Sequence, residues 1–355
     1  MKIVHTSDLH LGSALTSRLS PEKTKERKAE LISSFERSVE EAALRGATVY
    51  IIAGDLFDTE KITQGVRQSV ISIISRAPAI DFLYLPGNHE RLALLDDAEM
   101  LPQNLKIFGD DWTYFDYGFV TIAGRSRTDS TVFDNLTLDR EKKNIVVLHG
   151  ALSERSSDGI IGLRDAAERG IDYMALGHYH TYSKCEIDDR GIAVYCGTPE
   201  GRGFDETGEC GFCLIDTDGQ HMTYSFIPHA KRKIVIKNVD ISMLGGRVEI
   251  DEAIAIALAD VSFGDIVRVV LTGRHLPEIS PDTDTVLGRY RDKYYHFEIK
   301  DETGILINPE DYRYDKSLKG EFIRLVLEKE GLSDKMRERI IRTGIGALIG
   351  DLTDI

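Results

Sequence analysis

Five short polar motifs lie along the first half of the chain, and each follows directly on a short hydrophobic run. Runs rich in β-branched residues beside glycine are typical of buried strands. An amphipathic pattern over residues 22–44 separates the first two runs and predicts a helix, giving a β-α-β alternation. Because the carboxyl ends of strands in an open α/β sheet meet at one edge, we expect the motifs to come together there. The motifs are Ser7-Asp-Leu-His-Leu-Gly12, Gly54-Asp-Leu-Phe-Asp58, Gly87-Asn-His-Glu90, His149-Gly150 and Gly177-His-Tyr-His180.

The pattern changes twice after the last motif. Residues 181–228 carry short strands and turns, which we interpret as a second sheet that faces the first in a layered sandwich. The composition shifts near residue 229, and residues 230–312 then have the pattern of a small α/β module. Two helices are predicted in residues 313–355, the second capped by Ser333. We therefore predict an α/β fold with domains at 1–229, 230–312 and 313–355.

The motifs supply a mixed set of metal ligands: two carboxylates, one amide oxygen and four imidazoles. A hard divalent ion such as manganese or iron accepts this mixture. Two such ions about 3.5–4 Å apart can stabilise both the attacking and the leaving oxygen of a phosphate ester. Asp55 is the candidate bridging carboxylate because its motif is central, and His89 is the candidate proton donor to the leaving oxygen. The predicted ligands are Asp8, His10, Asp55, Asn88, His149, His178 and His180.

Glycines precede Asp55, Asn88 and His178, and we expect them to let the backbone turn sharply toward the site. Asp58 has two interpretations: it either orients a ligand or caps the following helix. His5 lies inside the first predicted strand and is expected to be packed rather than ligating.

Composition restricts the partners. The net charge of −15 argues against a surface that attracts nucleic acid over its whole area. Basic clusters at 231–233, 289–293 and 335–342 are interpreted as solvated faces interspersed with acids. Cys210 and Cys213 are interpreted as core thiols, since no second pair stands at zinc-ribbon spacing. No apolar run approaches the roughly 20 residues of a membrane span, and no signal peptide is evident, so we expect a cytoplasmic protein.

The motifs resemble those of the calcineurin-like metallophosphoesterase superfamily. Within it, Ser7-Asp-Leu-His-Leu-Gly12 and Gly54-Asp-Leu-Phe-Asp58 are similar to the SbcD-like nuclease component of DNA double-strand-break repair complexes. The similarity covers about residues 1–200, including Gly197-Thr-Pro199. It departs from the archaeal and eukaryotic pattern at Asp58, where those relatives have histidine. The protein phosphatase branch has Asp-Arg-Gly after its second motif, whereas Asp58-Thr-Glu60 stands here.

The resemblance implies a four-layer αββα sandwich that binds two Mn²⁺ ions. By position, Asp8, His10, Asp55 and His180 would hold one ion. Asp55, Asn88, His149 and His178 would hold the other, with His89 near the scissile phosphate. It further implies 3′-to-5′ exonuclease and single-strand endonuclease activity on DNA, a capping module and a coiled-coil SbcC-like ATPase partner.

Several alternatives stay open from the sequence. The C-terminal helices either bind the ATPase or pack on the chain itself, and the sequence decides neither this nor whether the protein is a homodimer. The rival functions are a phosphodiesterase for small nucleotides and an inactive scaffold with the same fold. The scaffold ranks low because every predicted ligand and His89 are present.

Overall fold

The computed structural model describes residues 1–13, 15, 19–59, 62–87, 101–276, 279, 281–306, 312 and 314–349. Asn88 and His89 therefore lie outside the described residues. The chain divides into two compact units, Met1–Ile234 and Val235–Ile355. The predicted boundaries at residues 229 and 312 remain a prediction, because this division separates only two parts.

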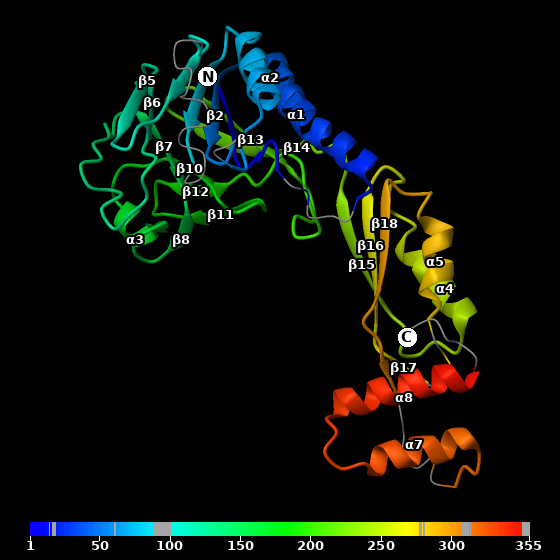
Figure 1. Cartoon of the computed structure of the whole chain (residues 1–355). Coiled ribbons are helices and arrows are strands. Elements are labelled where there is room, and N and C mark those ends of the chain that lie inside the picture. The colour runs from blue at the N-terminus through cyan, green and yellow to red at the C-terminus, as the bar shows by residue number, and fades with distance from the viewer. Residues whose placement is uncertain are drawn as a thin grey trace. The chain divides into compact units, whose positions relative to one another are not determined.

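The first unit contains two six-stranded sheets (Figure 1). The first sheet has the order β14-β13-β1-β2-β3-β4, in which β1 to β4 are parallel and β13 and β14 form an antiparallel extension beside β1. Its strands are β1 (Lys2–Thr6), β2 (Ala47–Ala53), β3 (Asp81–Leu85), β4 (Leu105–Ile107), β13 (Gly211–Thr217) and β14 (Met222–Pro228).

The second sheet has the order β11-β12-β10-β7-β6-β5, with a parallel centre and an antiparallel strand at each edge. Its strands are β5 (Thr113–Asp116), β6 (Val120–Gly124), β7 (Lys143–His149), β10 (Tyr173–Gly177), β11 (Ser183–Glu186) and β12 (Ile192–Tyr195). A small ladder of β8 (Ala151–Ser153) and β9 (Ile160–Gly162) follows β7.

A hydrophobic core lies between each pair of adjacent layers. One core joins the facing sides of the two sheets, with Ile51 and Leu83 from the first sheet and Val147 and Ala175 from the second. A second core packs α1 (Pro21–Leu44) and α2 (Gln64–Ser75) on the outer face of the first sheet (Figure 1). The outer face of the second sheet is covered by a third core that includes the short helix α3 (Leu163–Ala166). The predicted layered α/β fold is confirmed.

One detail of the predicted sandwich is wrong. Residues 181–228 do not form the second sheet by themselves, because β13 and β14 pair with β1 in the first sheet. The second sheet is instead built around β7 and β10, which end at the motifs of His149 and His178. The motifs are thus divided between two sheets rather than placed on one.

The second unit has its own core. The three-stranded sheet β15-β16-β18 packs with two helices, and a ladder of β17 and β19 precedes two further helices, α7 and α8. The helices α7 and α8 pack together through Ile323, Val326, Ile341 and Ile345. The elements are β15 (Ile234–Asp240), α4 (Arg247–Ala257), β16 (Ile266–Thr272), β17 (Arg274–His275), α5 (Thr283–Tyr290), β18 (His296–Asp301), β19 (Gly304–Ile305), α7 (Leu318–Glu328) and α8 (Asp334–Ile349).

The second C-terminal helix has the predicted cap. The α8 helix begins beside Ser333, whose hydroxyl accepts a hydrogen bond from the backbone N–H of Met336. Among the described residues, no helix combines the length and the apolar character needed to cross a bilayer.

Candidate metal centre

The described motif residues follow the carboxyl ends of strands from both sheets. Asp8 and His10 follow β1, Asp55 follows β2, His149 ends β7, and His178 follows β10. Asp8, His10, Asp55 and His178 have φ angles of 54°, 46°, 50° and 111°. Residues other than glycine rarely adopt positive φ angles, and such strain is concentrated at functional sites. The strands therefore bring these residues to one place in backbone conformations that have an energetic cost.

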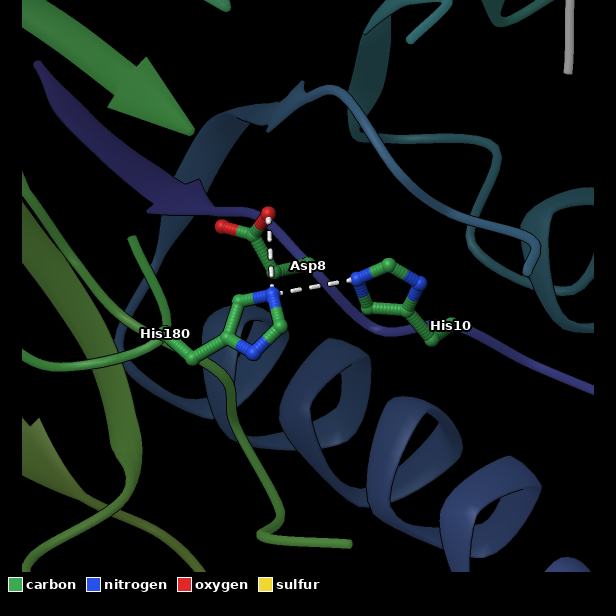
Figure 2. Close-up of side chains that lie close together, drawn as sticks. All are labelled: Asp8, His10 and His180. Carbon is green, nitrogen blue, oxygen red and sulfur yellow. Dashed lines mark hydrogen bonds and ion pairs between the residues drawn. The ribbon is translucent and has the colours of Figure 1, made fainter. Parts of the chain in front are cut away.

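Asp8, His10 and His180 form the first group of candidate ligands (Figure 2). The Nε2 atoms of the two imidazoles are 3.2 Å apart, and His180 Nε2 lies 3.9 Å from Asp8 Oδ1. The Asp8 side chain is fully buried, and it accepts hydrogen bonds from Ser7 Oγ at 2.5 Å and from the backbone N–H of His178 at 3.0 Å. These donors hold the carboxylate in place beside the imidazoles.

Asp8, Asp55 and His149 form a second group, in which the candidate ligand atoms lie within 4.8 Å of one another. Asp55 Oδ2 is 3.4 Å from His149 Nε2 and 3.6 Å from His10 Nε2. Asp55 therefore stands between imidazoles of both groups, as a bridging ligand requires. Asp8 also belongs to both groups, which the sequence interpretation did not anticipate.

Three predicted site residues remain: His178, which the structure describes, and Asn88 and His89, which it does not. The His178 ring packs edge-on against the His149 ring at 5.6 Å between centroids, yet His178 belongs to neither ligand group. Burial and the neighbouring His149 lower its pKa, which keeps the imidazole neutral and able to bind a cation. Asn88 and His89 lie outside the described residues, so their roles remain predictions.

The site has the electrostatic character of a cation site. Burial alone would lower the pKa of His149, but the Asp55 and Asp8 carboxylates outweigh it and raise this pKa to about 9. An environment that stabilises an imidazolium also stabilises a metal cation. The donor set of carboxylate oxygens and imidazole nitrogens is one that Mn²⁺, Fe²⁺ and Zn²⁺ accept. The described residues therefore fit a metal centre.

The glycines before the ligands act mainly by leaving room. A Cβ atom on Gly54 would lie 2.1 Å from His149 Nδ1, and one on Gly87 would lie 2.1 Å from Asp55 Oδ1. A Cβ on Gly177 would meet the backbone oxygen of Ala53 at 2.0 Å. Of the three, only Gly54 combines this contact with a positive φ, of 91°. The predicted sharp turn thus holds at Gly54, whereas the other two glycines permit close packing behind the site.

Sequence reasoning missed two residues that contact the site, Arg202 and Glu206. Glu206 Oε1 lies 2.7 Å from His180 Nδ1, and Arg202 contacts both Glu206 and Asp58. Burial would raise the pKa of Glu206, but hydrogen bonds with His180 and Arg202 lower it to about 2, so the carboxylate is charged. The sequence signal is weak, because an acid and a base four residues apart usually form a solvated pair.

Asp58 lies on the outer side of His10. Its Oδ1 atom is 3.1 Å from His10 Nδ1 and 3.4 Å from the Arg202 guanidinium. It does not cap the following helix, because Thr63 accepts the capping hydrogen bond from Val66 at the start of α2. The structure therefore favours the ligand-orienting interpretation of Asp58.

Other polar residues have structural surroundings, as expected. His5 is buried against the Tyr173 hydroxyl and the Leu176 carbonyl, and burial lowers its pKa to about 3. Cys210 and Cys213 form no disulfide and are buried, and burial raises the pKa of each thiol to about 12. Neither cysteine has the depressed pKa of a reactive thiol.

The basic clusters are balanced by acids within the described residues. Lys231 and Arg232 pair with Glu30, and Lys233 pairs with Glu209. In the second unit, Arg289 pairs with Asp251 and Arg342 pairs with Asp301. These pairs support the interpretation of each cluster as a mixed-charge face.

Comparison with known proteins gives a family. Residues 1–204 match the family model described as calcineurin-like phosphoesterase. The chain is 26% identical over 216 residues to the DNA double-strand break repair protein Mre11 of Saccharolobus solfataricus, covering 56% of this chain and 55% of that protein.

Two bacterial relatives have comparable identity. The uncharacterized metallophosphoesterase YhaO of Bacillus subtilis is 26% identical over 64% of this chain and 60% of its own length. The SbcD component of the nuclease SbcCD from Staphylococcus saprophyticus is 24% identical over 64% of this chain and 69% of its own length. The chain thus spans little more than half the length of the first relatives it matches.

Proposed function

The chain belongs to the calcineurin-like phosphoesterase family, and from this premise we propose that it is a Mn²⁺-dependent DNA phosphodiesterase. The proposed activities are 3′-to-5′ exonuclease and single-strand endonuclease cleavage during double-strand-break repair. Relatives named as Mre11 and as a component of the nuclease SbcCD support the DNA substrate.

One observation carries the proposal: candidate ligands from both sheets converge within a few ångströms. Asp8 and His10 come from the first sheet and His149 and His180 from the second, and Asp55 lies between them. Asp8, His10 and His180 would hold one ion, and His149 with the predicted ligands Asn88 and His178 would hold the other. Asp55 would bridge the two ions. When bound, the two ions would polarise the phosphoryl group and stabilise the attacking and leaving oxygens of an in-line displacement.

The protein side chains have separate tasks in this proposal. The buried hydrogen bonds to Asp8 keep its carboxylate from rotating, so the ligand set is preorganised before the substrate arrives. His149 Nδ1 lies 3.0 Å from the Ala53 carbonyl, which directs its Nε2 toward Asp55. His89 is proposed to donate the proton that the leaving oxygen takes up.

A second candidate function is a phosphodiesterase for small nucleotides. The net charge of −15 favours it, as do the acids that balance the basic clusters of the described residues. A DNA enzyme with this surface would need added affinity from elsewhere. The proposed sources are the predicted capping domain at 230–312 and an SbcC-like coiled-coil ATPase.

The C-terminal helices are proposed to bind this ATPase. Their facing sides are already used, because α7 and α8 pack on each other. The outward sides expose Leu318 and Leu325 on α7 and Met336 on α8, each more than half exposed. These exposed apolar side chains are the contacts that we propose the ATPase covers.

A nuclease assay tests the proposed function. Purified full-length protein would be incubated with 5′-labelled linear duplex, 5′-labelled single strands or a cyclic dinucleotide, each with Mn²⁺, Mg²⁺ or chelator. We expect DNA to be shortened from its 3′ end with Mn²⁺ and cleavage to stop with chelator.

His10→Ala is expected to abolish cleavage in this assay, because it removes a ligand near both Asp8 and Asp55. His221→Ala is the matched control, because His221 is exposed in a surface turn beside Asp218 and belongs to neither ligand group. If the protein hydrolyses the cyclic dinucleotide and leaves the DNA substrates uncleaved, the second candidate function is supported instead of the first.

A further inference from the structure

Two carboxylates lie behind the imidazoles of His10 and His180, on the side away from the convergence of their Nε2 atoms. Glu206 Oε1 is 2.7 Å from His180 Nδ1, and Asp58 Oδ1 is 3.1 Å from His10 Nδ1. Glu206 is 2% exposed, so water does not compete for it. Both Nδ1 atoms thus lie near carboxylates, although the buried His10 Nδ1 lacks hydrogen-bond geometry toward Asp58. Both Nε2 atoms face each other at 3.2 Å.

Arg202 joins the two carboxylates. Its guanidinium contacts Glu206 Oε1 at 2.5 Å and Asp58 Oδ1 at 3.4 Å, and its backbone N–H donates to Glu206 Oε2 at 2.6 Å. The fixed fork of a guanidinium can hold two acceptors at once, which an ammonium group does less well. We call Asp58, Arg202 and Glu206 the outer clamp.

The outer clamp contacts His180 on its Nδ1 side through two groups. Glu206 Oε1 lies 2.7 Å from this nitrogen as an ion pair, and the Arg202 guanidinium makes a hydrogen bond with it at 3.2 Å. Both contacts leave Nε2, which faces Asp8 and His10, to bind a cation.

His149 has a different partner. Its Nδ1 faces the neutral backbone carbonyl of Ala53 at 3.0 Å. Carboxylate partners increase the basicity of a ligating imidazole and fix its orientation, and their loss typically lowers metal affinity about 10–100-fold. The two groups of candidate ligands are therefore supported unequally, because the carboxylates of the outer clamp contact imidazoles of only the first group.

We propose that Asp58, Arg202 and Glu206 are positioning residues that selectively strengthen one of two divalent-cation sites, the one formed by Asp8, His10 and His180. The inference rests on the proposed function only in requiring that the centre binds metal. It goes further by giving Asp58, Arg202 and Glu206 a defined task and by making the two sites separable.

Calorimetric titration of the metal-free, full-length protein with Mn²⁺ tests this inference. For Glu206→Gln we expect one of two binding steps to weaken about 10–100-fold while the other stays unchanged. Arg202→Lys should weaken the same step, because a lysine cannot bridge both carboxylates. Glu209→Gln is the matched control, since Glu209 pairs with Lys233 on the surface and should leave both steps unchanged.

The thermal midpoint in chelator measures what Glu206 contributes to folding. It should fall for Glu206→Gln, because Arg202 and His180 lose a buried charged partner, so binding is titrated well below this midpoint. Weakening of both binding steps alike would overturn the inference in favour of a structural role. Unchanged binding in Glu206→Gln would overturn it while leaving the proposed function intact. A wild-type protein that binds no Mn²⁺ would overturn both.

Discussion

At the scale of single residues, the site combines strained backbone with compensating hydrogen bonds. Asp8, His10 and Asp55 occupy the left-handed region, at a cost of about 1–3 kcal/mol each. The loops after β1 and β2 bond to each other, with the N–H of Asp8 donating to Gly54 O and that of His10 donating to Asp55 O. These backbone bonds hold the two loops in register, so the candidate ligands are positioned by the fold itself.

Replacement of His89 with alanine tests the predicted proton donor. We expect turnover to fall about 10²–10⁴-fold, the usual contribution of general acid catalysis, while two Mn²⁺ ions still bind. Single-turnover cleavage of labelled DNA measures the rate, and calorimetry measures the metal. A variant that cleaves at the wild-type rate, or one that no longer binds metal, would show that His89 has a different role.

Part of this site could be predicted from the sequence. Asp8, His10, Asp55, His149 and His180 come together in the structure because their motifs follow strand ends, which hydrophobic runs reveal. Of the outer clamp, the sequence offered Asp58 as a ligand-orienting residue, but Arg202 and Glu206 could not be predicted in the same way. Arg202 and Glu206 follow Gly197-Thr-Pro199, and only tertiary folding shows that this segment reaches His180.

At the scale of elements, α1 is attached to the rest of the unit by a buried charge network. Arg27 is fully buried and donates to Glu30 at 2.7 Å and to Glu200 at 2.7 Å. Arg232 and Lys231 also donate to Glu30, from the segment that follows β14. Removal of one member of a buried ion pair costs about 3–5 kcal/mol, because the remaining charge is left without a partner.

The charge state of Glu30 makes the stability of this unit depend on pH. Burial would raise its pKa, but hydrogen bonds from Arg232, Lys231 and Arg27 lower it to about 2 from the ordinary 4.5. A depressed carboxyl pKa stabilises the fold fully above the unfolded value. That contribution is lost as the pH falls from about 4.5 to about 2.

Glu30→Gln is therefore expected to destabilise the protein by about 3 kcal/mol at pH 7. The difference from wild type should shrink as the pH approaches 2, where the wild-type carboxyl also becomes protonated. Urea unfolding of both proteins from pH 7 to about 2 measures this difference in the free energy of unfolding. A difference that stays constant with pH would show that Glu30 contributes through shape rather than charge.

The elements were more predictable than their arrangement. The helix expected at residues 22–44 is α1 (Pro21–Leu44), and its periodicity reflects the single face that packs on the first sheet. The pairing of β13 and β14 with β1 was not predictable, because the sequence of a short alternating strand does not indicate which strand it pairs with. The assignment of strands to the two sheets depends on long-range packing instead.

At the scale of the whole molecule, charge and metal chemistry point in different directions. The net charge of −15 would repel DNA, whereas a two-metal centre attracts phosphate. We propose that the predicted capping domain at 230–312 and an SbcC-like ATPase would supply the DNA affinity. Both assignments presuppose the metal centre, because the proposed cleavage of DNA requires two bound metal ions.

Anomalous diffraction from a crystal soaked in Mn²⁺ tests the metal centre most directly. We expect two peaks about 3.5–4 Å apart, one beside Asp8, His10 and His180 and the other beside Asp55 and His149. Data collected from a crystal of the His10→Ala variant should show the first peak weakened or lost. The absence of peaks at these side chains, or Mn²⁺ bound only at surface carboxylates, would contradict the two-metal centre.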